Sequence, residues 1–494
     1  MSLVPQPAIR ALNSITISAT VSGLTPPMSR LFSFKGVDAS GQTWALQVPV
    51  WFYGVSPNYS IQLTSALSTV PQNTASDPSC QWSHPVAVQE NGGFAMQLSR
   101  FTLGSTVLTS RIQSIFGTTR LAPYGTLQGT VCLSATDVSA GQSKAYALQA
   151  LSEDGSTIST SLTAAFAAPP TNPVALTLSH NAVSLRDGSA AATVGITLPN
   201  ASQAWTASVI GSQITTRWLK LSANKGTGAG EVTLTASAAG LSDGVYNATL
   251  VIQSPNANPP VVSVPVIFTV GSATTTSIAG VAHAASFKTI FAPGMIMSVF
   301  GTQLAPSTQQ AASLPLPLSL AGVSATVNGV TARLYFVSQG QLNIQVPYET
   351  SAGLAVLAVN NNGQIASFTF TVSPAAPGIF VGSGSTLVPT AASRAGQVLV
   401  LYMTGEGDVN PSLRDGETPP ASTALRNLPA PRLPVTVSVG GAPATTQFIG
   451  IPPGLAGVTQ INFVIPPTTP VGTQPVVVNV GGVDSQPANI TITP

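Results

Sequence analysis

The sequence predicts an all-β protein built from tandem immunoglobulin-like β-sandwich domains. Short runs in which apolar and polar residues alternate recur along the chain, such as "VALTLSH", "EVTLTAS" and "QPVVVNV". Turn residues separate these runs, as they do in β-sandwiches. The chain contains 44 Gly and 41 Pro, and both residues disfavour helices, as do Thr and Val. No stretch shows a convincing amphipathic helix of three turns.

The length and three low-complexity joints predict the domain organisation. A chain of 494 residues is long enough for three or four domains, each with its own core. The joints are "FAAPPTNP" (166–173), "GSATTTS" (271–277) and "SPAAPG" (373–378), and such Pro-rich or small polar segments are typical of linkers. We therefore predict four domains, over residues 1–168, 172–270, 278–377 and 378–494.

The composition indicates an extracellular protein. Hydrophobic residues make up 44% of the chain, which excludes a disordered chain. Charged residues make up only 6%, against roughly 25% in typical soluble domains. The 17 basic residues are scattered and the formal net charge is +2, so nucleic-acid binding is not expected. No uninterrupted apolar run reaches the length of about 20 residues that a membrane-spanning helix needs.

The N-terminal stretch "MSLVPQPAIR" does not have the pattern of a secretory signal. Such a signal has a basic segment followed by an apolar one. The composition leads us to expect an exported protein whose export signal is absent from this sequence. The alternative is a protein that is not exported.

The two cysteines, Cys80 and Cys132, both lie in the first third of the chain. In an oxidising compartment they would be able to form one disulfide, which a chain-entropy estimate values at ~4 kcal/mol. The alternative is a pair of free buried thiols. Neither cysteine belongs to a Cys-x-x-Cys or Cys/His pattern, so no metal site is predicted from them.

Residues 217–254 have a distinctive order of strands and turns. A Trp-led strand meets a Gly-containing turn, another strand follows, and "GLSDGVY" leads into the last strands. In this order the segment resembles the second half of a BACON domain, an Ig-like sandwich common in secreted bacterial proteins. BACON domains were suggested to bind carbohydrate, so the resemblance implies sugar binding without giving a site. We predict that Trp218 and Tyr246 lie in the core and that Gly226, Gly228 and Gly244 supply turns with positive φ.

The last two predicted domains are copies of one unit. The run "VSATVNGVTARLYFVSQGQLNIQVP" (323–347) aligns with residues 435–466, which carry extra residues around "GIPPGLAG". An apolar strand ending at a Gly precedes each copy, and a Gly turn and a strand follow it. The pattern resembles IPT/TIG-type immunoglobulin-like domains.

Four further motifs in residues 278–494 follow a specific order. They are "HAASF", "APGMIMSVFGTQLA", "LYFVSQGQLNIQVP" and "LYMTGEGDVNPSLRDG". With them this region closely resembles a C-terminal domain family of uncharacterised secreted proteins from Solibacter and other acidobacteria. His283 replaces the Asn usual in that family, and nothing obvious depends on the change. The family has no assigned activity, so the resemblance implies a fold and a secreted setting but no chemistry.

The repeat carries the pattern Gln-x-Asn in both copies. Gln341 and Asn343 correspond to Gln460 and Asn462. We predict that the intervening apolar residues are buried, and that the amides lie on the opposite face and bond the backbone of an adjacent loop. The alternative is a polar face that contacts a partner or a glycan. The apolar residues expected to be buried are Leu342, Ile344, Val346, Ile461, Phe463 and Ile465.

Motifs that would indicate catalysis are not found. His84, His180 and His283 lie in different local settings without a nearby nucleophile and acid, and no Gly-x-Ser-x-Gly elbow is present. "GTGAGE" (226–231) lacks the lysine and helix of a phosphate-binding loop.

The acidic residues gather only in "TGEGDVNPSLRDGE", at Glu406, Asp408, Asp415 and Glu417. Closely spaced oxygen ligands can hold calcium, but Arg414 intervenes and the spacing fits no EF-type loop. We therefore predict no catalytic residue, metal ligand or cofactor.

The best candidate for ligand binding is an aromatic strand in the first domain, "WALQVPVWFYGVSPNY" (44–59). If alternate residues from Trp44 to Phe52 face the core, Trp51 and Tyr53 face outward. Adjacent exposed aromatics bind sugar rings and also anchor protein interfaces. The alternative is a strand that is buried on both faces or covered by a loop.

These observations predict a non-enzymatic binding or adhesion module that works outside the cell or at its surface. Polysaccharide or another surface protein is the expected partner. A purely structural spacer is the first alternative. An enzyme with its site in the N-terminal domain is the second.

Overall fold

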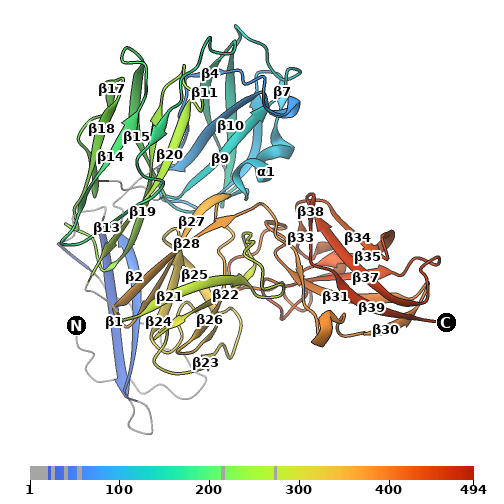
Figure 1. Cartoon of the computed structure of the whole chain (residues 1–494). Coiled ribbons are helices and arrows are strands. Elements are labelled where there is room, and N and C mark those ends of the chain that lie inside the picture. Colours follow the sequence, from blue (N-terminus) through green and yellow to red (C-terminus); the bar gives the residue numbers. More distant parts are fainter. Residues whose placement is uncertain (1–20, 24–27, 38–42, 53–57, 213–216, 272–274) are drawn as a thin grey trace.

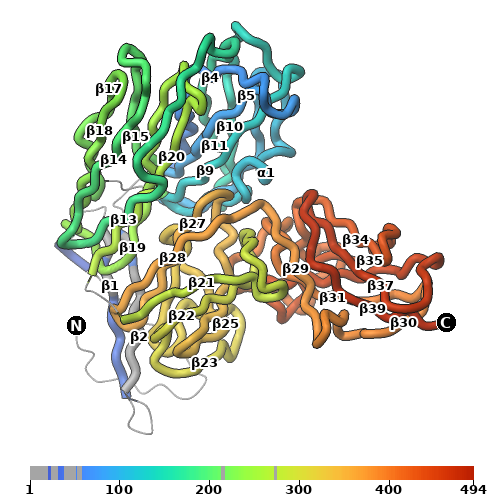
Figure 2. The backbone as a smooth tube through the Cα atoms, in the orientation of Figure 1, coloured from blue at the N-terminus to red at the C-terminus, as the bar shows by residue number. Residues whose placement is uncertain are grey.

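The structure is a computed structural model that describes residues 21–23, 28–37, 43–52, 58–212, 217–271 and 275–494. The predicted all-β class is confirmed: nearly every element is a strand, and the one α-helix in these ranges, α1 (Ile112–Phe116), has five residues. Four large apolar cores follow one another along the chain. The first two immunoglobulin-like sandwiches lie side by side, the third packs below them, and the fourth projects to one side (Figures 1 and 2).

The first sandwich encloses a core that extends from Ile61 to Phe166. Its aromatic side chains pack closely, and the rings of Phe101 and Tyr146 stack with centroids 5.4 Å apart. One sheet contains β3 (Ile61–Ser65), β5 (Trp82–Glu90) and β9 (Thr126–Leu133). The other contains β4 (Thr69–Pro71), β11 (Thr157–Ala167), β10 (Ser143–Ser152), β6 (Met96–Leu103) and β7 (Thr106–Val107), with β8 (Arg120–Leu121) beside β6.

The predicted aromatic strand belongs to neither of these sheets. It is β2 (Thr43–Phe52), which pairs with β1 (Met28–Val37) in a separate antiparallel hairpin. β2 lies beside β24 (Val323–Val327) of the third sandwich. The sequence grouped this segment with the first sandwich, because alternation along a strand does not say which sheet the strand joins.

The second sandwich confirms the predicted core aromatics. Trp218 and Tyr246 are buried, and Trp218 stacks on Phe268 at 5.6 Å between ring centroids. One sheet contains β12 (Thr177–Leu178), β14 (Ala191–Thr197), β18 (Gly230–Ala236) and β16 (Leu219–Leu221). The other contains β13 (Val183–Arg186), β20 (Val261–Val270), β19 (Gly244–Gln253), β15 (Ala204–Gly211) and β17 (Lys225–Thr227).

The glycine predictions in this sandwich are correct at only one of three positions. Gly228 has φ +61°, as a turn requires, whereas Gly226 and Gly244 do not have positive φ. Gly226 is needed for a different reason: a Cβ there would lie 2.3 Å from the ring of Trp205. Close approach of a core aromatic to the backbone, rather than a left-handed turn, therefore explains this glycine.

The third and fourth sandwiches have corresponding strand orders. The third runs β21 (Ser277–His283), β22 (Ile296–Thr302), β26 (Gln341–Gln345), β25 (Val330–Val337), β24, β27 (Gly353–Asn361) and β28 (Gln364–Val372), with β23 (Gln309–Gln310) beside β25. The fourth runs β29 (Gly378–Ile379), β31 (Val398–Thr404), β36 (Thr459–Val464), β35 (Ala442–Gly450), β34 (Val435–Val439), β37 (Gly472–Val480), β39 (Ala488–Thr493) and β30 (Ala392–Arg394), with β38 (Val483–Asp484) beside β37. A small two-stranded antiparallel sheet of β32 (Val409–Asn410) and β33 (Ala430–Pro431) adjoins the fourth.

The repeat prediction is confirmed at the Gln-x-Asn strands. β26 lies between β22 and β25, and β36 lies between the equivalent β31 and β35. The apolar residues of both strands are fully buried. The predicted partner of the amides is wrong, however. Gln341 donates to the Asn343 side chain and Gln460 donates to the Asn462 side chain, both at 2.8 Å. The two amides satisfy each other along the strand and do not bond a loop backbone.

Candidate functional site

The predicted ligand-binding residues cannot be placed in a site. The backbone of Trp51 lies in β2 opposite Ser29, but its side chain and the whole of Tyr53 lie outside the described residues. Among the side chains that are described, Phe287 is the only exposed Phe, Tyr or Trp, at 69% exposure. That part of the molecule therefore shows no group of adjacent exposed aromatics.

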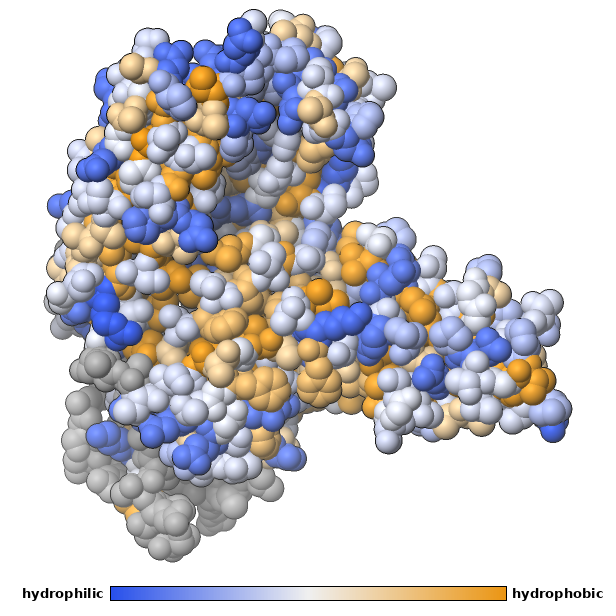
Figure 3. Space-filling model, in the orientation of Figure 1, coloured by the Kyte–Doolittle hydropathy of each residue, from blue (hydrophilic) through white to orange (hydrophobic). Residues whose placement is uncertain are grey.

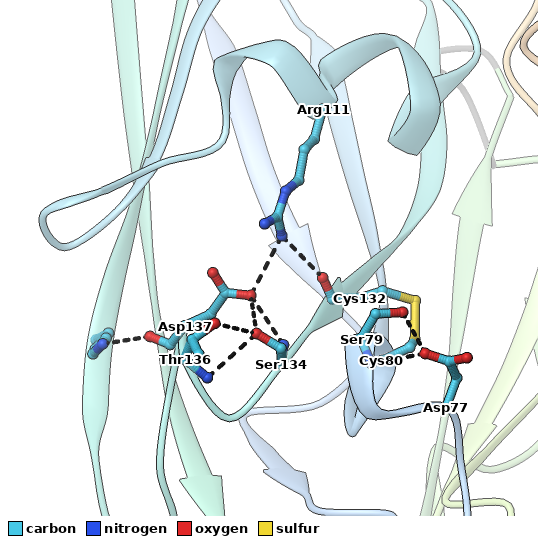
Figure 4. A network of polar contacts seen from close by, with 9 residues as sticks. Asp77, Ser79, Cys80, Arg111, Cys132, Ser134, Thr136 and Asp137 are labelled. Carbon is cyan, nitrogen blue, oxygen red and sulfur yellow. Dashed lines mark hydrogen bonds and ion pairs between the residues drawn. A yellow bond between two sulfur atoms is a disulfide. The ribbon is translucent and has the colours of Figure 1, made fainter. Parts of the chain in front are cut away.

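Cys80 and Cys132 form a disulfide that joins the loop before β5 to the end of β9. Polar contacts hold both ends, as Figure 4 shows. Asp77 accepts hydrogen bonds from the Ser79 backbone N–H (2.8 Å) and hydroxyl (2.6 Å). Beyond Cys132, Asp137 pairs with Arg111 at 3.4 Å. The sequence was compatible with either a disulfide or two free thiols, and the structure contains the disulfide.

The three histidines lie in separate places and do not form a catalytic arrangement. His84 is buried in the first core, 3.2 Å from the Tyr146 hydroxyl, and burial lowers its pKa to about 4. His180 is exposed beside Ser179. His283 is buried; its Nδ1 accepts the N–H groups of Ala285 and Ser286, so Nε2 carries the proton and donates to the Ala376 carbonyl. His283 thus holds the turn after β21 against the linker to the fourth sandwich.

The acidic residues lie in a segment that we call the junction loop, residues 405–417, which follows β31 and contains the two-residue strand β32. Asp408 in this loop is fully buried and contacts the first sandwich. The Arg120 guanidinium donates to Asp408 Oδ1 at 2.7 Å, and Thr119 donates to Oδ2 through its backbone (3.1 Å) and its hydroxyl (2.5 Å). Arg432 pairs with the same carboxylate at 3.1 Å. One carboxylate therefore binds residues about 290 positions away in the sequence and closes the contact between the first and fourth sandwiches.

The third sandwich joins the same junction. The ring of Tyr348 lies under the Arg120 guanidinium at 4.2 Å, a cation–π contact. Asp415 accepts the Tyr348 backbone N–H at 3.0 Å, and Gln345 accepts the Gly416 N–H at 2.6 Å. Burial opposes the charge of Arg120, but the charges of Asp408, Tyr348 and Glu349 and the hydrogen bond to Asp408 together outweigh burial and raise the pKa of the guanidinium. Three sandwiches thus meet around one buried ionic cluster.

A second set of contacts fixes the third sandwich to the fourth. The Ile296 N–H donates to the Thr404 hydroxyl at 3.0 Å, and this hydroxyl donates to the Gly457 carbonyl at 2.7 Å. The Tyr335 hydroxyl donates to the Ala456 carbonyl. Because these are backbone and hydroxyl contacts of buried or half-buried groups, they hold the two repeats in a defined orientation.

Glu406 is the unusual member of the junction loop. It is fully buried, and neither carboxylate oxygen has a hydrogen-bond partner among the described residues. Burial raises the pKa of Glu406 to about 7. Its charge in turn contributes to the raised pKa values of Tyr348 and Tyr335. Burial, together with the charge of Glu349, also raises the pKa of Asp415.

The geometry explains why the acidic loop does not resemble a calcium site. Asp408 is occupied by two arginines, and Asp415 holds a backbone N–H. No group of three or more His, Cys, Asp or Glu side chains within the described ranges is arranged to hold a metal ion. The loop therefore acts in domain contact. Alternation and motif spacing do not reveal this contact, because Thr119 and Arg120 lie almost 290 positions from Asp408.

We predict a pH effect that originates at Glu406. Its pKa is about 7 in the folded protein and about 4.3 in an unfolded chain. The folded state therefore binds the proton more tightly, and the stability from this group is full below about pH 4.3 and is lost as the pH rises to 7. Glu406→Gln should be more stable than the wild type above pH 7, by on the order of 3 kcal/mol, and the two should converge near pH 4.

Thermal unfolding of both proteins from pH 4 to 8 measures this difference. His84 and His283 titrate in the same range, but they are common to both proteins and cancel in the comparison. A constant difference across the range would contradict the prediction.

Comparisons with known proteins reveal only distant structural likeness. No family model matches the chain, and no curated protein matches it. Among solved structures, a Bacteroides ovatus mixed-linkage glucan utilization locus protein, SGBP-B, in complex with a mixed-linkage heptasaccharide, has 14% identity and a TM-score of 0.27. The match covers 66% of this chain and 67% of that one.

Two further structures have lower TM-scores. The extracellular region of plexin A4 has 9% identity and a TM-score of 0.16, over 88% of this chain and 48% of that one. The I9–I11 tandem of titin has 8% identity and a TM-score of 0.13, over 64% of this chain and 99% of that one. This chain therefore spans about half of the plexin region. At these scores the likenesses carry no argument about function.

Proposed function

We propose that the chain is a non-enzymatic extracellular or cell-surface binding module that holds its β-sandwiches in one fixed arrangement. The observation that carries the proposal is the buried cluster of Arg120, Asp408 and Arg432, which joins distant parts of the chain. A fixed arrangement suits a protein that presents several surfaces to one large partner. Polysaccharide or another surface protein is the proposed partner class.

Other features support the extracellular setting. A disulfide such as Cys80–Cys132 persists in oxidising compartments and is rare in the cytosol. The surface has few charges, and Figure 3 shows hydrophobic side chains scattered among hydrophilic ones over the visible face. No helix in the described part of the chain is long and apolar enough to cross a membrane. The resemblance of residues 278–494 to a secreted acidobacterial domain family, and of residues 172–270 to BACON domains, belongs to the same proposal.

The aromatic strand gives the first test of binding. We expect the intact protein to be retained on at least one insoluble polysaccharide, and Trp51→Ala and Tyr53→Ala to lose this retention without a change in melting temperature. A platform of this kind contributes only ~0.5–1.5 kcal/mol per aromatic contact, so repeated contacts with a polymer are needed for affinity. Pull-down assays on a broad panel of insoluble polysaccharides measure the retention of the wild type and of both variants. A fall in stability of ~3–5 kcal/mol would show instead that these are core residues.

A structural spacer is the second candidate function. The observation in its favour is that Phe287 stands alone as an exposed aromatic among the described side chains. If the intact protein is retained on no polysaccharide and captures no surface protein, the spacer is the better account. An enzyme with its site in the first domain is the remaining alternative; its His84 is enclosed in the core, with no exposed surface.

A further inference from the structure

A cleft with a cavity volume of about 80 Å³ lies between the second and third sandwiches. β19 of the second sandwich runs beside β27 and β28 of the third, and Figure 1 shows these strands next to one another. The second sandwich contributes the segment from Ser242 to Tyr246, and the third contributes residues of β24, β25, β27 and β28. Domain interfaces are a common place for small-ligand sites.

The polar side chains around the cleft have unused hydrogen-bonding capacity. Asp243, Ser324, Thr326 and Thr331 all line it, and their side chains make no hydrogen bond with another described residue. Ser324 is notable because it is only 5% exposed. Asn360 uses its side-chain oxygen to accept the Gly363 N–H at 2.7 Å, which leaves its NH₂ group as a donor toward a ligand. Buried hydroxyl and amide groups without a protein partner normally bind water or a ligand.

The remaining lining is apolar and includes an aromatic ring. Ala325, Val359 and Ile365 supply aliphatic surface from the third sandwich. Tyr246 contributes its ring from the second, and its hydroxyl is held by the Ser242 carbonyl at 2.7 Å. A sugar ring presents hydroxyls at its edge and C–H groups on its faces, so a mixture of hydroxyl, amide, carboxylate and apolar surface matches its chemistry.

Charge and size narrow the class of ligand. Asp243 is the only charged residue in the lining, so the cleft disfavours anions. A volume of about 80 Å³ has room for roughly five to eight water molecules. This is enough for one ring or part of a ring rather than for an oligosaccharide. A terminal or protruding residue of a neutral polymer would fit, with the rest of the polymer outside.

We propose that this cleft binds one sugar residue of a neutral polysaccharide. The inference rests on the proposed function, since it names a site for the glycan that the binding module would hold. β2, the strand that carries Trp51, lies beside β24, which supplies Ser324 and Thr326. The predicted aromatic strand and the cleft thus share a neighbouring strand, β24.

The test is calorimetric titration of the intact protein with neutral hexasaccharides, namely cellohexaose, xylohexaose and mannohexaose. One of them should bind, and Asp243→Ala and Asn360→Asp should each weaken that binding about 5- to 30-fold, as the loss of one ligand hydrogen bond does. Asn360→Asp keeps the acceptor for Gly363. Thr326→Trp, which fills the cleft, should abolish binding. The matched control is Asp187→Ala, another exposed aspartate of the second sandwich, which should bind like the wild type.

The possible results distinguish failure of the cleft as a binding site from failure of the proposed function. If Trp51→Ala or Tyr53→Ala abolishes binding while the cleft variants bind like the wild type, the cleft is not the site, and the proposed function stands. If the wild type binds no hexasaccharide and is retained on no polysaccharide, both the cleft and the glycan form of the proposed function fail. Asp243 is exposed, so its variant should fold even if Thr326→Trp does not.

Discussion

Asp408→Ala is expected to destabilise the protein by about 3–5 kcal/mol, because it leaves buried arginine without its counterion. Arg120 has a side-chain exposure of only 8% and its charge is paired by Asp408 alone among the acidic groups within 4.0 Å. Arg432 is more exposed, at 23%, and should recover part of its hydration. The loss should therefore come mainly from Arg120.

Differential scanning calorimetry is the appropriate measurement, since a chain of several domains does not unfold in two states. We expect the variant to melt at a lower temperature and its transitions to separate as the sandwiches lose their common junction. The double variant Asp408→Leu with Arg120→Met should regain part of the stability, since it removes the buried unpaired charge of Arg120, while Thr119 still lacks its acceptor. Melting of Asp408→Ala indistinguishable from that of the control Asp187→Ala would contradict this role.

Removal of the disulfide is the second large effect. Cys80 and Cys132 are 52 residues apart, and the entropy of closing such a loop corresponds to about 4 kcal/mol. In a sandwich of roughly a hundred residues this lowers the melting temperature by about 15–30 °C. The double variant Cys80→Ala, Cys132→Ala should show this loss in the transition of the first sandwich.

A reducing agent provides the matched control for the disulfide. It should lower the melting temperature of the wild type toward that of the double variant and leave the double variant unchanged. If reduction of the wild type, verified by thiol titration, does not change its melting, the bridge does not stabilise the first sandwich.

The sequence predicted the repeated strands well because their pattern is local. Alternation placed Ile344 and Phe463 on buried faces, and both are fully buried. The same pattern placed the amides on the opposite face, but it did not identify their hydrogen-bond partners. A Gln two residues before an Asn can bond that Asn along the strand as easily as it can bond a loop. Hydrogen-bond partners depend on rotamers, which alternation does not encode.

Contacts between residues far apart in the chain could not be predicted from the sequence. The pairing of Arg120 with Asp408 joins residues 288 positions apart, and neither residue lies in a motif with a known partner. The sequence placed four acidic residues in one loop, but the role of this loop in domain contact is visible only in the fold. Gly226 is a second example. A glycine is required there because the Trp205 ring packs against its backbone, and this contact cannot be predicted from the local sequence.

The most direct test of the account is the distance between the first and fourth sandwiches in solution. Spin labels at Ser159→Cys on β11 and Thr436→Cys on β34, both exposed positions, would report it by pulsed electron paramagnetic resonance. A single narrow distance distribution in the otherwise wild-type protein, which broadens when Asp408→Ala is added, is the predicted result. A broad distribution that is the same with and without Asp408 would show that the junction does not hold these sandwiches in a fixed arrangement.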